Sequence, residues 1–249
     1  MRNLIAEWKK EESSEFHGWD FSRLKGRKID ERLPWNYNKL AKKLISKSVS
    51  VLDMGTGGGE VLSSFAPFHC RVTATEGYRP NYLLAKKRLE PLGVDVINYS
   101  NSTTRKLQFK SGEFDLVLNR HDAFNIPELS RILKGNGTFL TQQVGKDNLT
   151  DLMRFFRAKP QFKVLPFRKA KSSLVDAGFE IKLSREWEGR TEFKDVGAIV
   201  YFLKNAPWIV KGFSVDGHLK YLLKLQKGIE NGKKLVFRED RYVIQAEKS

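Results

Sequence analysis

A strand that ends in an acid and runs into a glycine-rich turn constrains this chain more than any other feature. Residues 49–52 are mostly aliphatic and predict a buried strand; Asp53 follows, and four of the five positions from 55 to 59 are glycine. A helix is expected to begin at Glu60. Such a strand, turn and helix present backbone N–H groups at the ligand edge of a parallel α/β sheet. The sequence therefore predicts a site for a nucleotide-like ligand.

The two common phosphate-binding motifs fit this turn poorly. Glu60 stands where a dinucleotide fingerprint needs its third glycine, and no Gly-Lys-Ser/Thr follows to make a P-loop. Asp53 would repel a pyrophosphate but can accept hydrogen bonds from an amino group. A second strand, residues 72–76, ends in Glu76, which suits two ribose hydroxyls. These acids favour an amine-bearing nucleoside.

Residues 49–144 resemble the class I S-adenosylmethionine-dependent methyltransferases, whose first motif is an acidic strand end followed by G-x-G-x-G. The resemblance implies S-adenosylmethionine as cofactor and S-adenosylhomocysteine as product. Asp53 and the turn would hold the methionine part, and Glu76 the ribose. Ser102 and Thr103 stand where similar enzymes commonly place an adenine-binding Asp. The full set expected around the cofactor is Asp53, Gly55, Thr56, Gly57, Gly59, Glu76, Gly77, Tyr78, Ser102, Thr103 and Asn119. A purely structural glycine-rich turn is the alternative.

The same resemblance implies an α/β fold with a Rossmann-like, seven-stranded, mostly parallel sheet, an antiparallel last strand and helices on both faces. An N-terminal helical segment, 1–48, precedes the core, 49–188, and 241–249 form the final strand. If the sixth strand is parallel and the seventh antiparallel, the connection 189–240 begins and ends above the ligand edge and is too long for a hairpin. It is predicted to be a helical substrate cover.

The fourth predicted strand, 114–118, delivers Asn119, Arg120, His121 and Asp122 to the ligand edge. His121 could act as a general base, Asn119 or Arg120 could orient cofactor or substrate, and Asp122 could orient the histidine. Alternatively, the four residues only complete a strand end. The other histidines and the single cysteine lack the spacing of a metal site, so no metal is predicted.

Aromatic residues in irregular segments are candidates for the substrate pocket. Trp35 and Tyr37 precede the first strand of the core, and Trp208 and Phe213 lie in the predicted cover. Packing is the commoner use of such rings, and it is the interpretation favoured for Trp19.

The formal net charge of +16 lies mainly outside the motifs. Residues 151–249 carry 21 Lys and Arg against 12 Asp and Glu, whereas residues 51–150 carry 12 against 10. Basic and aromatic residues alternate in 151–171, which could bind RNA, although an amphipathic helix with core phenylalanines explains the aromatics. The start of the chain lacks a signal-peptide pattern and no apolar run could span a membrane, so a cytoplasmic protein is expected.

The sequence thus favours methyl transfer to an N or O nucleophile of a small-molecule or unassigned acceptor. The alternative acceptor is an RNA base, since 189–247 are faintly similar to the tail of ribosomal RNA guanine-N1 methyltransferases, although their cysteine-rich zinc module is missing. A third hypothesis is a non-catalytic nucleic-acid-binding module. The acceptor atom and the oligomeric state stay open.

Overall fold

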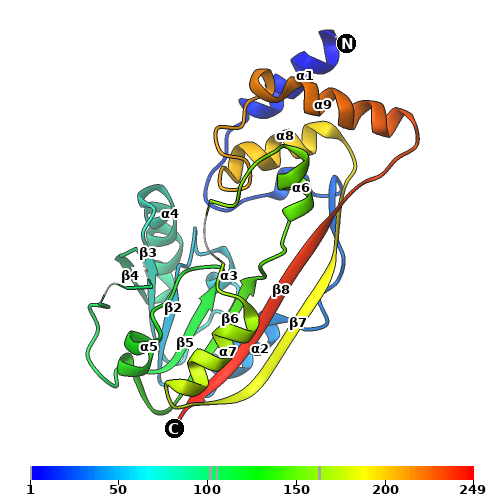
Figure 1. The fold of residues 1–249 in the computed structure, drawn as a ribbon. Coiled ribbons are helices and arrows are strands. Elements are labelled where there is room, and N and C mark those ends of the chain that lie inside the picture. The colour runs from blue at the N-terminus through cyan, green and yellow to red at the C-terminus, as the bar shows by residue number, and fades with distance from the viewer. Residues whose placement is uncertain (1, 101–102, 105, 162–163) are drawn as a thin grey trace.

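The computed structural model of the chain describes residues 2–100, 103–104, 106–161 and 164–249, whose strands form one sheet in the order β1-β7-β8-β6-β5-β2-β3-β4 (Figure 1). Five strands run parallel: β2 (Ser50–Met54), β3 (Arg71–Glu76), β4 (Val94–Asn98), β5 (Phe114–Arg120) and β6 (Leu133–Val144). The last strand, β8 (Leu235–Lys248), lies antiparallel between β6 and β7 (Phe179–Phe193). The prediction of a mostly parallel sheet with an antiparallel final strand is confirmed.

The sheet has one strand more than the seven predicted. β1 (Lys28–Asp30) pairs antiparallel with the edge of β7, in register from Lys28 with Phe193 to Asp30 with Thr191. Its three residues have only one apolar member and show no strand periodicity. The strand exists because β7 offers an open row of backbone donors and acceptors at its edge, which the local sequence does not reveal.

Helices cover both faces of the sheet because side chains along each strand alternate between them. On one face, Leu52 and Met54 share a core with α5 (Ile126–Ile132) and α7 (Phe167–Asp176). On the other, Val51 packs with α2 (Tyr37–Ile45), α3 (Glu60–Ser63) and α4 (Arg79–Leu89). Two short 3₁₀ turns, η1 (Ser22–Leu24) and η2 (Glu90–Leu92), complete the connections.

Beyond the parallel strands, β7 and β8 continue together as a long ribbon, which β1 joins at the far end. Their pairing extends to Phe193 and Leu235, so the predicted insertion boundaries at 189 and 240 fall inside the ribbon. The connection then holds α8 (Val196–Asn205) and α9 (Val215–Glu230). Asp195 caps α8 by accepting from Ala198 N at 2.8 Å, and Ser214 caps α9 by accepting from Gly217 N at 3.1 Å.

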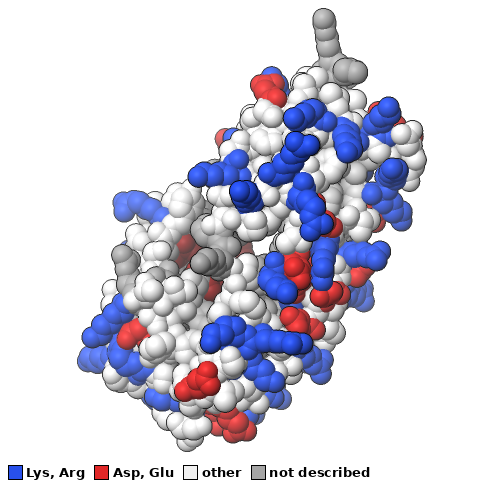
Figure 2. All heavy atoms as spheres, viewed as in Figure 1, with Lys and Arg blue, Asp and Glu red and all other residues white. Residues whose placement is uncertain are grey.

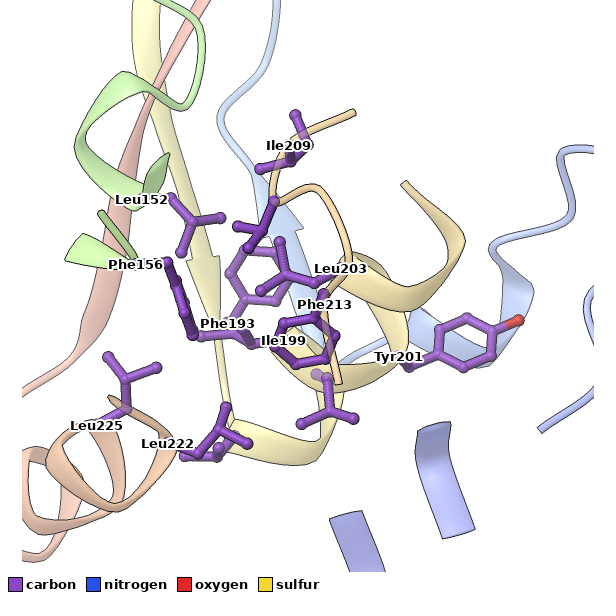
Figure 3. Packing of buried hydrophobic residues seen from close by; sticks show 14 of the residues in the cluster. Leu152, Phe156, Phe193, Ile199, Tyr201, Leu203, Ile209, Phe213, Leu222 and Leu225 are labelled. Atoms are coloured by element: carbon purple, nitrogen blue, oxygen red, sulfur yellow. The ribbon is translucent and has the colours of Figure 1, made fainter. Parts of the chain in front are cut away.

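Four helices gather at the far end of this ribbon and are called the cap: α1 (Arg2–Glu12), α6 (Thr150–Phe155), α8 and α9 (Figure 1). They enclose an apolar cluster of their own, in which Phe156, Ile199 and Leu222 approach one another from three segments (Figure 3). The predicted N-terminal segment 1–48 is therefore divided: α1 belongs to the cap, whereas α2 packs on the sheet.

The basic segment 151–171 is likewise divided between the two regions. Its first part, α6, lies in the cap, and its last part opens α7 on the sheet. Phe156 and Phe167 consequently pack in different cores, and Phe162 lies outside the described residues. The expectation of one continuous amphipathic helix is wrong. No helix among the described residues has the length and apolar character needed to cross a membrane.

Candidate functional site

The glycine turn after β2 is shaped by two close contacts. Gly55 and Gly57 both have positive φ, +70° and +65°, a conformation that side chains disfavour. A Cβ on Gly55 would meet Asp122 Oδ2 at 2.2 Å, and one on Gly57 would meet Trp19 Cδ1 at 2.5 Å. Neither position can accept a larger residue without movement of these neighbours. The turn therefore brings Asp122 from the end of β5 and Trp19 from the N-terminal segment to the same place.

The helix after the turn is shorter than the sequence predicts. α3 spans only Glu60–Ser63, whereas a helix to about residue 67 is expected from the pattern. The hydroxyls of Ser63 and Ser64 donate back to the carbonyls of Glu60 and Val61, a local alternative that competes with helix continuation. Because α3 is only one helical turn long, its macrodipole is small. The acidic side chains around the glycine turn therefore decide which ligand charge is favoured there.

Glu76 at the end of β3 is held in a fixed orientation. Its two carboxylate oxygens accept hydrogen bonds from Gly57 N at 2.8 Å and from Tyr78 N at 2.7 Å. The side chain is buried, and burial raises its pKa although these N–H groups oppose the rise. The Gly77 N–H also faces this carboxylate, and the acceptor capacity that remains can serve a hydroxyl group of a ligand.

Asp53 sits half-buried at the carboxyl end of β2, on the face that carries α2. Burial raises its pKa to about 6; the Thr56 hydroxyl and Arg120 oppose this rise, and the nearby Asp122 and Glu76 add to it. Three carboxylates thus share a small region and destabilise one another's charge. A cationic ligand would relieve that repulsion, and an anionic one would increase it.

Three buried polar atoms at this edge lack a hydrogen bond of ordinary geometry among the described residues: Asn119 Nδ2, Thr56 Oγ1, which faces Asp53, and the Tyr37 hydroxyl, which faces the Asn119 backbone. The Asn119 oxygen is by contrast fully engaged, since it accepts from Gln143 Nε2 at 2.6 Å and Thr141 Oγ1 at 3.2 Å. Buried polar groups are rarely left unpaired. Three of them beside the acids indicate a site shaped to receive a polar ligand.

A chain of hydrogen bonds from Trp35 through Gln142 to His121, here called the relay, fixes the tautomer of the histidine ring. Trp35 Nε1 donates to Gln142 Oε1 at 2.8 Å, and Gln142 Nε2 lies 3.2 Å from His121 Nε2. An indole N–H only donates, so the amide oxygen must face Trp35 and the amide nitrogen must face the ring. His121 Nε2 therefore accepts, and the proton of the neutral ring resides on Nδ1.

The environment of His121 favours this neutral form. Desolvation at this edge, together with the positive charges of Arg241 and Arg120, lowers the pKa of His121 well below its usual value, although the residue keeps an exposed surface. The residue has a φ of +62°, and its backbone N–H continues the β5–β6 pairing by donating to Gln142 O at 2.9 Å. The sequence suggests Asp122 as the residue that orients the His121 ring, but in the structure Gln142 contacts the ring. Asp122 lies against Gly55 instead.

The other candidate residues divide into those at this edge and those away from it. Tyr37 lies under Arg120, whose guanidinium carbon is 5.9 Å from the ring centroid. Trp208 reaches the edge indirectly, because its ring meets Trp19 edge-on at 5.5 Å and Trp19 covers Gly57. Phe213 lies in the cap core, 5.9 Å from Phe156 (Figure 3), away from the glycine turn.

The region expected to hold an adenine ring is only partly described. Gly77 approaches the chain closely, since a Cβ there would meet Ser100 Cα at 2.6 Å. Tyr78 and Thr103 are exposed, and Ser102 lies outside the described residues. These residues remain candidates by position.

Sequence reasoning missed two residues of the site, Trp19 and Gln142. Trp19 stands next to Gly18, where an added Cβ would lie 3.2 Å from Glu60 Oε1. Gly18 and Trp19 therefore both pack closely against the glycine turn. The aromatic run around Trp19 was the only signal, and it does not distinguish packing from lining a site. Gln142 gives no local signal, because its role depends on the pairing of β5 with β6.

Comparison with known proteins agrees with this geometry. Residues 52–141 match the family model described as a methyltransferase domain. The chain is 30% identical over 132 residues to a protein-L-isoaspartate O-methyltransferase from Alcanivorax borkumensis, covering 52% of this chain and 60% of that protein. It is 25% identical over 147 residues to a sterol 4-C-methyltransferase from Caenorhabditis elegans, covering 54% and 44%. The chain thus spans about half the length of these relatives.

The fold has counterparts among solved structures. A structure described as a putative methyltransferase from Bacillus halodurans superposes with a TM-score of 0.60, covering 86% of this chain and 98% of that one, at 22% identity. At this identity the likeness concerns the fold alone.

Proposed function

We propose that this chain, whose residues 52–141 match a methyltransferase-domain family model and whose sheet has a Rossmann-like fold, transfers the methyl group of S-adenosylmethionine to an N or O nucleophile. The observation that carries the proposal is the cluster of Asp53, Glu76 and Asp122 around the glycine turn. S-adenosylmethionine bears a sulfonium and an ammonium group, so a triply acidic site suits it better than a pyrophosphate.

The residues present fit this cofactor part by part. Asp53 would accept from the ammonium group, Glu76 would accept from the ribose hydroxyls, and the Gly55 to Gly57 turn allows close approach. Asn119 Nδ2 and Thr56 Oγ1, which lack a hydrogen bond of ordinary geometry among the described residues, offer further polar contacts beside Asp53.

The cofactor supplies an activated methyl group, so the chain's own residues need mainly to position the acceptor and exclude water. His121, held neutral with Nδ1 protonated, can donate a hydrogen bond to an acceptor oxygen or nitrogen. Its Nε2 lone pair is already engaged by Gln142, so a direct role as general base requires that contact to break. We therefore assign His121 to positioning of the acceptor before proton removal.

The surface is hollowed between the cap and the sheet, as Figure 2 shows, and we propose that the acceptor enters there. Trp19 and Trp208 form an aromatic contact that reaches from Gly57 to the cap, which suits a small acceptor with a flat or apolar part. The basic surface of the cap favours the alternative, a base of RNA. The relatives' names cite an isoaspartate oxygen and a sterol carbon, so they do not select between these.

Two measurements test the proposal. Calorimetry of the intact chain with S-adenosylmethionine and with S-adenosylhomocysteine should show binding of both, with one site per chain. Incubation with methyl-labelled cofactor and cell extract, separated into small-molecule and RNA fractions, should place the label in one fraction. Absence of cofactor binding would overturn the proposal and favour a non-catalytic module on this fold. Binding without any labelled product would contradict the transfer activity.

A further inference from the structure

Three acidic residues of the cap, Glu11, Asp195 and Asp216, are paired with basic residues on the side where α1 packs. Glu11 accepts from Arg23 and Arg27, and Asp195 accepts from Arg27 at 2.6 Å. Asp216, in the first turn of α9, pairs with Lys9 of α1 at 2.8 Å. These carboxylates are therefore neutralised by basic groups of the N-terminal segment. They do not compensate the charges on the other side of the cap.

On that other side, α6 and α9 present basic groups that lack ion-pair partners within 4.0 Å among the described residues. Lys220, Lys224 and Lys227 are exposed and follow one another at helical spacing, so they lie along one face of α9. Arg154 and Arg157 are exposed at the end of α6. We call these five residues the cationic face. An uncompensated cluster of this kind creates a positive potential that attracts polyanions.

Aromatic rings lie between these charges. Phe155 of α6 and Tyr221 of α9 approach edge-on at 6.1 Å, which brings the two helices together. Lys224 Nζ lies 5.6 Å from the Phe155 ring, and Lys220 Nζ lies 5.0 Å from the Tyr221 ring. Both rings are only partly buried. Partly exposed rings among cations are the combination on which unpaired bases stack while their phosphates bind the charges.

The position of the cationic face relates it to the site. Figure 2 shows Lys and Arg side chains distributed over the cap and down to the hollow between the cap and the sheet. The large exposed apolar residues lie elsewhere, at Trp19, Ile29, Val49, Tyr78, Leu83, Leu92, Val175 and Val236. The face therefore lacks the apolar groups that a membrane-surface helix inserts, which argues for a soluble polyanion.

We propose that the cationic face binds single-stranded nucleic acid and guides it toward the hollow. The phosphates contact Lys220, Lys224 and Arg157, and unpaired bases stack on the accessible parts of the Phe155 and Tyr221 rings. This inference is independent of which acceptor is methylated: a bound strand can be the acceptor itself or a tether that places the enzyme on an RNA.

The test is fluorescence anisotropy of the full chain with a labelled single-stranded oligouridylate, from 50 to 200 mM salt. The triple variant K220Q/K224Q/R157Q removes three phosphate contacts, so the slope of log affinity against log salt should fall by about 2, at about 0.7 per contact for single strands. The matched control K42Q/K43Q/K87Q removes three exposed lysines from α2 and α4 and should leave the slope nearly unchanged.

Three outcomes would overturn the inference: no binding of the wild-type chain at 50 mM salt, an equal loss in both variants, or stronger binding to anionic phosphatidylserine vesicles than to RNA. A duplex of the same length should bind more weakly than the single strand, because its bases cannot stack on Phe155 and Tyr221, and equal binding would contradict the role of the rings. Both variants should bind S-adenosylmethionine as the wild type does, which separates this result from the fate of the proposed activity.

Discussion

The ligand edge of the sheet and the cap differ in how completely each satisfies its own polar groups. At the ligand edge, three carboxylates lie together, and buried polar atoms of Tyr37, Thr56 and Asn119 have no partner of ordinary geometry among the described residues. In the cap, Arg27 bridges Glu11 and Asp195, and the pKa of this arginine rises mainly through its bond to Asp195. These partly buried charges of the cap thus have partners within the protein, whereas several buried polar groups at the ligand edge do not have a hydrogen bond of ordinary geometry in the described part of the chain.

This contrast shows where stability and binding are separated in the molecule. Substitutions that reduce the charge repulsion at the ligand edge should weaken cofactor binding while leaving the fold equally or more stable, a known opposition between function and stability. Substitutions of paired residues in the cap should lower the stability of the fold and leave cofactor binding unchanged. Four predictions test the contrast, in order of decreasing effect.

The largest effect is expected from Asp53→Asn. Loss of a partly buried carboxylate that pairs with an ammonium group should weaken S-adenosylmethionine binding by about 100-fold, measured by calorimetry. The melting temperature above pH 6 should stay the same or rise, because a strained negative charge is removed. Asp95→Asn, on the exposed side of β4, serves as the control and should bind normally. Equal affinities of the two variants would refute the assignment of Asp53.

The next effect concerns the cap. Arg27→Ala leaves Glu11 and Asp195 without their shared partner and should lower the free energy of unfolding by about 2 kcal/mol, a value between those of exposed and buried pairs. Hydrogen exchange should accelerate first in α1 and α8. Cofactor affinity at low temperature should not change. Lys182→Ala, which breaks a surface pair with Glu180, should have little effect. Faster exchange in β2 and β3 instead would contradict a cap that is stabilised by itself.

The third effect is on pH dependence. Because the pKa of Asp53 is about 6 without ligand, the carboxylate takes up a proton as the pH falls through 6, and a cationic ligand then loses its partner. Affinity for S-adenosylmethionine should be nearly constant from pH 7 to 8 and fall by up to about tenfold per pH unit below 6. Asp53→Asn should abolish this dependence. A profile that is flat to pH 5 in the wild type would contradict it.

The smallest effect is expected from the relay. Gln142→Leu removes the amide that donates to His121 Nε2, so both ring tautomers should become populated, as read from the ¹⁵N chemical shifts of the imidazole. Trp35→Phe frees the amide to rotate and should produce part of the same change. Cofactor affinity should vary only a few-fold. An unchanged tautomer in Gln142→Leu would show that other groups fix the ring.

Much of the sheet could be predicted from sequence because its signals are local. The strand end at Asp53, the glycines after it and the second acid at Glu76 each follow from a few adjacent residues. The antiparallel last strand came from a family resemblance, since local pattern cannot set strand direction. The short β1 escaped prediction because its pairing with β7 is set by tertiary contact alone.

Candidate site residues could be predicted from the sequence only where they lie at the end of a predicted strand. Asp53 and Glu76 are among the last residues of β2 and β3, and His121 directly follows β5, so all three lie at the carboxyl ends of neighbouring parallel strands. Trp19 and Gln142 act through contacts with residues far along the chain, such as Gly57 and Trp35. Phe213 shows the opposite ambiguity: an aromatic in a cover segment suits a core as well as a pocket wall, and here its ring lies beside those of Phe156 and His218.

The pairing of β7 with β8 sets the distance between the cap and the rest of the sheet. Its paired residues run without interruption from Leu183 with Gln245 to Phe193 with Leu235, so this distance is fixed by the number of residue pairs. Each residue pair added or removed would move the cap by about 3.3 Å along the strands. An odd number of residues inserted into one strand would turn its side chains to the opposite face. Lengthening or shortening these two strands together would therefore change the distance between the cap and the glycine turn without altering the strand ends that carry Asp53 and Glu76.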